Sequence, residues 1–164
     1  MPDLAWWMQN FKTSAFRLEA LQVYDSPRET EMLAAFMRGE KVRLPDDFAW
    51  LQMVRSHAGA GRSMQRVRMI QYPLSDYIRF EMSLYPQCVE AGEEVRIYEG
   101  DGSLLGSPND FWLFDSDTCF QLHYDGRGAF LGAEPVEATY NRQRMRLALQ
   151  RSMPLLDYTT RATR

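Results

Sequence analysis

The chain has 164 residues, of which 45% are hydrophobic and 13% aromatic. It is long enough for one ordinary hydrophobic core and too apolar to stay disordered. Its net charge of −3 combines an acidic body, with 13 basic and 20 acidic residues over positions 1–136, and a basic segment beyond it. The acidic body opposes a phosphate backbone, so direct binding of nucleic acid is not expected.

The N-terminus has no basic region before an apolar stretch, and no apolar run is long enough to cross a bilayer. Cys88 and Cys119 have no Cys or His partner at ligand spacing, which favours reduced, buried thiols in a cytoplasmic protein. P-loop, dinucleotide-binding, zinc-protease and nucleophile-elbow motifs are absent. We therefore expect no metal, no cofactor and no membrane association.

The first half of the sequence predicts helices. Apolar residues at helical spacing predict a first helix over residues 11–24. Ser26 and Glu29 then form the pattern of a capping box, with Pro27 at the first helical position and Gly39 as the end of the helix. A third helix is predicted after Pro45, and it ends in the glycine-containing loop 59–61.

The pattern then changes to strands with one interrupting helix. Residues 66–72 predict a strand, and residues 74–85 predict a helix that ends at Pro86. Four short strands are predicted at residues 95–99, 111–115, 119–124 and 129–133. The last two are joined by a tight turn at Asp125-Gly126-Arg127-Gly128, in which glycine supplies positive φ.

A basic helix is predicted over residues 137–151, and a frayed tail after Pro154. The whole is a single α+β domain over residues 1–153, with N-terminal helices, a mainly antiparallel sheet, one interrupting helix and a C-terminal helix. Residues 154–164 form the expected flexible tail. The arginines of the basic helix indicate either contact with an acidic partner or a solvated surface.

Glu81 is the most informative single residue. On a helix that begins at Leu74 it falls within the apolar face, whereas Asp76 and Arg79 fall on the opposite side. A buried carboxylate requires a partner or a raised pKa. Glu81 is therefore a candidate general acid or base, or a ligand anchor, while an internal ion pair with an arginine is the more frequent explanation for such a residue.

Arg66 and Arg68 share one face of a predicted strand that leads directly into the helix of Glu81. They are the natural partners for its carboxylate. Guanidinium groups can equally hold the carboxylate or phosphate of a ligand through paired hydrogen bonds. We expect these two arginines either to neutralise Glu81 or to bind a small anionic ligand.

His123 is the second candidate acid or base. Strand alternation places it on the same face as Cys119 and Gln121, away from the core-facing side chains. Such a face either meets solvent or lines a pocket, so Gln121 is a candidate ligand-binding residue and His123 a candidate catalytic residue. A hydrogen-bonded structural imidazole is the alternative. A site, if present, is expected between this strand and the helix of Glu81.

Several ordered segments together resemble a known family. They are FRLEAL, SDYIRFEM, AGEEVRIYEG, NDFWLFD and LHYDGRGAFLGAE. These segments, spanning roughly residues 11–151, resemble an actinobacterial family catalogued as a domain of unknown function, whose members are often encoded beside helix-turn-helix regulators. The segment around Cys88 and the arginine-rich last helix depart from the usual pattern. The resemblance implies a cytoplasmic bacterial protein with a regulatory role, and it supplies no catalytic residues.

Two functions remain open from the sequence. The first is a non-catalytic regulatory or interaction module that binds a helix-turn-helix regulator, another protein or a small-molecule ligand. The second is a small enzyme of specialised metabolism that uses Glu81 and His123 as acid and base on an anionic substrate held by Arg66 or Arg68.

Overall fold

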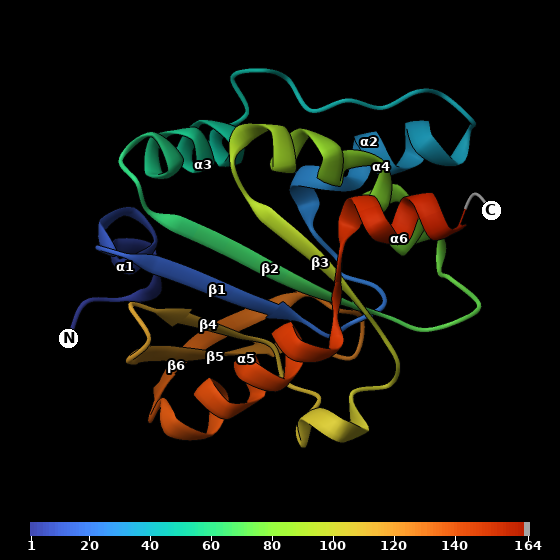
Figure 1. Ribbon diagram of the computed structural model, residues 1–164. Coiled ribbons are helices and arrows are strands. Elements are labelled where there is room, and N and C mark those ends of the chain that lie inside the picture. Colours follow the sequence, from blue (N-terminus) through green and yellow to red (C-terminus); the bar gives the residue numbers. More distant parts are fainter. Residues whose placement is uncertain (163–164) are drawn as a thin grey trace.

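A mixed sheet of seven strands organises the chain in the computed structural model, which describes residues 1–162 (Figure 1). In spatial order the strands are β6 (Phe130–Val136), β5 (Thr118–Tyr124), β4 (Phe111–Phe114), β1 (Ser14–Glu19), β2 (Ser63–Ile70), β3 (Glu94–Glu99) and β7 (Met153–Pro154). The pairs β1–β2 and β2–β3 are parallel, and the other four are antiparallel. The fold is therefore α+β, as the sequence predicts.

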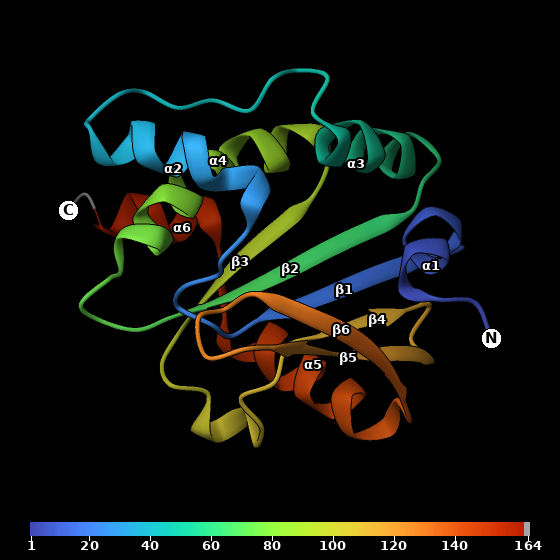
Figure 2. The ribbon, with the colours of Figure 1, turned by 180° about the vertical axis from the view of Figure 1, so that it is seen from behind.

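Six α-helices and two 3-10 turns of the described residues accompany the sheet. They are α1 (Leu4–Asn10), η1 (Pro27–Glu29), α2 (Thr30–Met37), α3 (Ala49–Gly59), α4 (Asp76–Ala91), η2 (Ser103–Leu105), α5 (Thr139–Arg151) and α6 (Leu155–Ala162). Figures 1 and 2 show α2, α3, α4 and α6 on one side of the sheet and α5 on the other. We call the side that carries α2–α4 the helix-rich face. Among residues 1–162, no helix is long and apolar enough to span a membrane.

The segment predicted as a first helix is instead β1, a central strand between β2 and β4. Phe16 and Leu18 point to one side of the sheet, and Ala15, Arg17 and Glu19 point to the other. Both sides are covered, so the strand lacks the simple polar–apolar alternation of a half-exposed strand. The charged residues Arg17 and Glu19 interrupt the apolar residues of this strand, so the spacing of the apolar residues resembles that of a helix.

Helix α4 does not end at Pro86 but continues to Ala91, where Gly92 closes it at a φ of 120°. Proline removes one backbone donor, and tertiary contacts beyond it hold the last turn. The side-chain amide of Gln87 donates to the carbonyl of Leu44 at 2.9 Å and accepts from its amide at 2.8 Å. Helix α4 thereby crosses between the parallel strands β2 and β3 as a βαβ connection, whereas β4, β5 and β6 pair in sequence as antiparallel neighbours.

The C-terminal segment also differs from the expected frayed tail. Met153 and Pro154 form β7, which pairs with β3, and α6 follows directly. Leu155 and Tyr158 are buried in the core, which explains why the helix is ordered. Residues 163 and 164, the end of that expected tail, lie outside the described residues.

The hairpin at Asp125 forms as predicted and joins β5 to β6. The amide of Asp125 donates to the carbonyl of Ala129 at 2.9 Å, and the amide of Gly128 donates to the carbonyl of Asp125 at 3.1 Å. Of the two glycines, Gly128 takes a positive φ of 86°, and Gly126 does not. Strand β4, predicted at residues 111–115, is buried throughout.

Candidate functional site

A cavity of about 440 Å³ lies between the helix-rich face of the sheet and the segments η1, α2, α3 and α4. Eight of its described lining side chains are aromatic, and they include Trp50 and Trp112. Arg28 and Phe130 also line it and are exposed, so the cavity opens to solvent there. This volume suits a small organic molecule.

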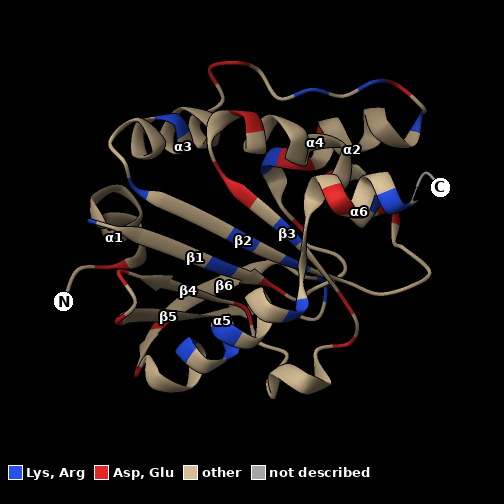
Figure 3. Cartoon of the chain, viewed as in Figure 1, with Lys and Arg blue, Asp and Glu red and all other residues tan. Residues whose placement is uncertain are grey.

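Charged side chains of the two central strands form the floor of the cavity. Arg17 on β1 is the cross-strand neighbour of Arg66 on β2, and Glu19 is the neighbour of Arg68. Because cross-strand neighbours share a face, all four side chains belong to the helix-rich face. Figure 3 shows basic positions along the middle of β1 and β2. Arg17, Glu19 and Arg66 line the cavity, and the fully buried Arg68 lies beside it.

Arg66 is held by two carboxylates. Its Nη1 lies 2.8 Å from Oε1 of Glu19, and its Nε donates to Oε1 of Glu93 at 2.7 Å. The second oxygen of Glu93 accepts from the indole Nε1 of Trp50 at 3.0 Å. The guanidinium carbon of Arg66 also lies over the rings of Trp50 and Tyr85, at 5.4 and 5.2 Å. This arginine is thus neutralised within the protein.

Glu19 is the carboxylate that joins Arg66 to Arg68, whose Nη1 lies 3.5 Å from Oε2 of Glu19. Burial opposes the charge of Glu19, but Arg66, Arg17 and Arg68 outweigh burial and lower the pKa of Glu19. Arg68 also donates to the carbonyl oxygen of Leu21. Neither of the two arginines predicted to pair with Glu81 forms a salt bridge with it in residues 1–162.

Arg17 is neutralised in the same way. Its Nη2 lies 2.9 Å from Oδ2 of the buried Asp110 and donates to the hydroxyl of Tyr124 at 2.8 Å. The hydroxyl of Tyr24 also donates to Asp110. The guanidinium lies over the ring of Trp112, with its carbon 5.5 Å from the ring centroid. The floor therefore combines charged groups, each matched to a partner, with aromatic rings.

Helix α4 supplies the opposite wall through Tyr77, Glu81 and Tyr85, which line the cavity. They are spaced four residues apart and so lie on one face of the helix. The hydroxyl of Tyr77 donates to Oε1 of Glu29 at 2.8 Å. The predicted capping box is therefore wrong, because Ser26 makes no side-chain cap bond and the carboxylate of Glu29 points to α4 instead.

Glu81 is buried, as the sequence predicts, with 9% of its surface exposed. Burial, its hydrogen bond to Glu29 and the charges of Glu29 and Glu19 raise the pKa of Glu81 well above its usual value. The internal ion pair expected for Glu81 is not formed with any arginine or lysine of the described residues. Its hydrogen-bond neighbours are instead an acid, Glu29, and the hydroxyl of Tyr77.

The hydroxyl of Tyr85 is buried in the cavity wall and has no hydrogen-bond partner in the described structure. Buried hydroxyls are nearly always bonded, so this group marks a place where a bound molecule could supply a partner. Cys88 also lines the cavity, and burial raises the pKa of its thiol to about 12. Its thiol therefore stays protonated at neutral pH and is a poor nucleophile.

His123 and Gln121 lie away from this cavity. On β5 they alternate with Phe120, Leu122 and Tyr124, and it is Tyr124 that lines the cavity. The Nε2 of His123 lies 2.9 Å from Oε2 of Glu134 on β6, where both side chains are partly exposed. Of the predicted site residues, Glu81 and Arg66 line the same cavity. His123 and Gln121 face the opposite side of the sheet. The site expected between Glu81 and His123 is not formed.

Sequence reasoning missed Glu19, Glu29 and Arg17. Glu19 and Arg17 were hidden by the wrong assignment of β1 as a helix, and Glu29 by its apparent capping role. The alternation Ala15, Arg17, Glu19 is a signal that could have revealed a charged strand face opposite Arg66.

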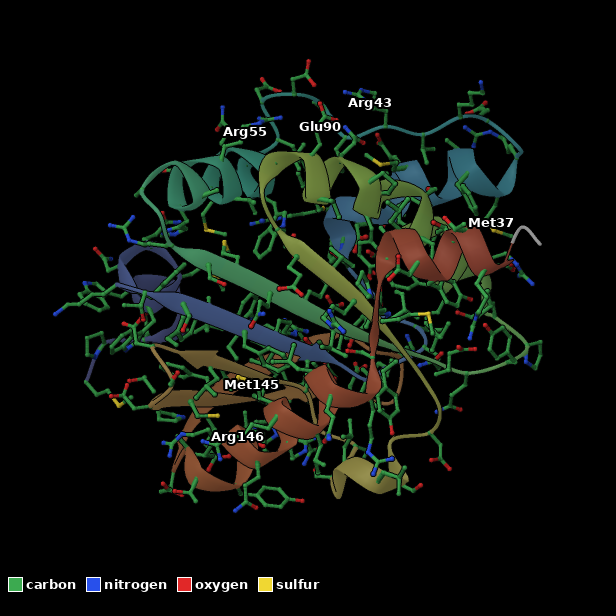
Figure 4. All side chains as sticks on the ribbon, viewed as in Figure 1. Met37, Arg43, Arg55, Glu90, Met145 and Arg146 are labelled. Carbon is green, nitrogen blue, oxygen red and sulfur yellow. The ribbon has the colours of Figure 1, made fainter. Side chains whose placement is uncertain are left out.

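The basic helix α5 lies on the other side of the sheet, and its arginines are not all solvated. Arg144 is buried and donates to the carbonyls of Leu105 at 2.9 Å and Asn109 at 3.0 Å. Arg146 lies on the outer side of this helix (Figure 4) and is exposed. Part of the basic charge therefore anchors the loop before β4.

A comparison with family models finds one that matches residues 2–160, described as a domain of unknown function (DUF6879). The chain belongs to this family. The sequence resemblance is thus confirmed at the level of a family whose function is not known. A comparison with curated proteins gives no significant match. The match includes every element that lines the cavity, so the cavity lies within the DUF6879 domain.

Proposed function

We propose that this protein is a non-catalytic regulatory module that binds a small molecule in the cavity between the helix-rich face and α4. The observation that carries the proposal is the cavity itself, about 440 Å³ in volume, with the buried and unpartnered hydroxyl of Tyr85 in its wall. Aromatic walls with a few polar groups are typical of small-molecule sites.

The geometry favours binding over catalysis. Glu81 and His123 face opposite sides of the sheet, so they cannot act together on one substrate. Cys88, the thiol in the cavity, is held in its protonated form by burial. The arginines of the floor are engaged by Glu19, Glu93 and Asp110. No described lining residue forms a nucleophile–base pair.

The partner and the location are further parts of the proposal. The family resemblance suggests an actinobacterial-type cytoplasmic protein whose ligand state is communicated to a helix-turn-helix regulator. The buried thiols of Cys88 and Cys119 support a reducing compartment. The acidic body and the internal use of Arg144 argue against direct contact with nucleic acid.

Native mass spectrometry of the protein purified from its own host tests the proposal. We expect an added mass of a few hundred daltons that disappears on denaturation, because a ligand buried in this cavity should survive gentle purification. Fluorescence gives a second readout, since Trp50 and Trp112 line the cavity. A host metabolite fraction should change the emission of the ligand-free protein. A bare chain mass together with unchanged emission would contradict the proposal.

A further inference from the structure

The basic groups of the cavity floor have carboxylate partners, whereas the two acids of the opposite wall have no basic partner among the described residues. The positive groups of the floor, Arg17, Arg66 and Arg68, are matched by Asp110, Glu93 and Glu19. Arg17 and Arg66 line the cavity, and so does Arg28, which is exposed at the opening, where water screens its charge. Each described guanidinium of the floor thus has a carboxylate partner, although the buried Nε of Arg68, which does not line the cavity, makes no hydrogen bond.

The acids of the opposite cavity wall, Glu81 and Glu29, are not paired in this way. Glu81 and Glu29 both line the cavity, and neither forms a salt bridge with a basic side chain of residues 1–162. Two adjacent carboxyl groups repel each other when both are ionised, and a cation between them removes this repulsion. These two lining acids therefore present acceptors for a positive group.

Tyr85 follows Glu81 by one helical turn, and its hydroxyl has no partner in the described residues although Tyr85 is only 1% exposed. A protonated amine has N–H donors that a carboxylate and a phenol oxygen can accept together. Aromatic rings such as those of Trp50, Trp112 and Tyr24 line the cavity and suit the apolar body of such a ligand.

From these relationships we propose that the cavity binds a small protonated primary amine with an apolar or aromatic body, its ammonium group held by Glu81, Glu29 and the hydroxyl of Tyr85. This inference rests on the proposed function and adds the charge class of the ligand. It departs from the anionic ligand expected from Arg66 and Arg68, because both arginines are occupied by carboxylates.

Calorimetric titration of the full chain with three matched probes tests the inference. The probes are 2-phenylethylamine, the neutral 2-phenylethanol and the anionic 3-phenylpropanoate. We expect the amine to bind at millimolar concentration or below, and the other two to bind at least about tenfold more weakly, as loss of one charge-assisted hydrogen bond predicts. Absence of amine binding at millimolar concentration, or equal or tighter binding of the anion, overturns the inference.

Variants then locate the ammonium group. Glu81→Gln should weaken binding of the amine about tenfold to a hundredfold and leave that of 2-phenylethanol unchanged. Tyr85→Phe should weaken amine binding several-fold, because it removes the acceptor. Glu90→Gln is the matched control, since Glu90 lies on the same helix but is exposed at the outer surface (Figure 4). Unchanged amine affinity in Glu81→Gln would overturn the inference.

The test of the amine assignment can be distinguished from the test of ligand binding in the cavity. If host-purified protein carries an anionic or neutral ligand, the cavity is still a binding site, and only the assignment of an amine is wrong. If it carries an amine that Glu81→Gln no longer retains, both proposals are supported.

Discussion

Glu81 on α4 and Glu29 on η1 lie together in the cavity wall, and the described residues provide neither with a basic partner. This relationship is unusual because three arginines lie nearby, each bonded to other carboxylates. The protein thus keeps a buried acid at a place where an internal ion pair was expected. Burial and the neighbouring Glu29 raise the pKa of Glu81, so this acid is held in its neutral form, which needs no basic partner.

Glu81→Gln should raise the stability of the ligand-free protein at neutral pH. Burial and Glu29 raise the pKa of Glu81, so the folded state favours the neutral form, and stability is lost as the pH rises through the folded-state pKa. Glutamine has nearly the same shape and no charge. We expect a gain of about 1 kcal/mol, or about 2–4 °C in melting temperature at pH 8.

Thermal unfolding at pH 5 and pH 8 checks this result, and the gain should be smaller at the lower pH. Glu90→Gln, exposed on the same helix, should change the melting temperature little at either pH. A marked loss of stability in Glu81→Gln would instead indicate that Glu81 is paired with a cation.

Glu19→Gln should destabilise the protein strongly, because Glu19 is shared by Arg66 and Arg68. Breaking a buried ion pair by removing one partner costs about 3–5 kcal/mol. Urea denaturation at pH 7 measures the loss. Glu40→Gln, which removes an exposed pair with Arg38, serves as the control and should cost no more than about 1 kcal/mol.

The same residue predicts an acid-induced loss of stability in the unmodified protein. The pKa of Glu19 is lower in the folded state than in the unfolded state. Its contribution is therefore fully present above the unfolded value of about 4.3 and is lost as the pH falls toward the folded value. Urea midpoints between pH 6 and pH 3 should fall less in Glu19→Gln than in the unmodified protein. Parallel curves would show that Glu19 does not control the acid response.

Gly128→Ala should destabilise the hairpin. Gly128 has a φ of 86°, and a Cβ there would lie 2.4 Å from the backbone oxygen of Val23. The left-handed conformation alone costs about 1–2 kcal/mol for a residue with a Cβ, and the overlap adds to it. Gly126→Ala is the matched control, because a Cβ there meets nothing within 4 Å. Equal melting temperatures for the two variants would contradict this account.

Arg144→Leu should release the loop before β4. A buried carbonyl left without its donor costs about 1–3 kcal/mol, and Arg144 serves the buried carbonyl of Leu105 and the part-buried carbonyl of Asn109. We expect a loss of about 3 kcal/mol in urea denaturation, with faster hydrogen exchange over residues 101–110. Arg146→Leu changes an exposed arginine on the same helix and should leave both measurements nearly unchanged. Similar effects of the two variants would argue against the anchoring role.

Local sequence patterns predicted the structure correctly at elements that have one apolar face and one polar or exposed face. The helical spacing around Glu81 predicts its burial correctly, and the hairpin at Asp125 follows from its glycines. Local patterns failed at β1, where Arg17 and Glu19 lie inside the protein, and at Pro86, where Gln87 and Cys88 hold the helix beyond the proline. In both cases long-range contacts outweighed local preference.

The sequence by itself determined the α+β class, the burial of Glu81, and the alternation that separates His123 from the core. Those features depend on residue order and side-chain periodicity alone. Only the tertiary structure decided which acid each arginine binds, because Glu19 and Glu93 reach Arg66 through strand pairing and helix packing between distant segments. Because the arginines bind these other acids, Glu81 and Glu29 face the cavity without a basic partner among the described residues. No local sequence pattern predicts this arrangement.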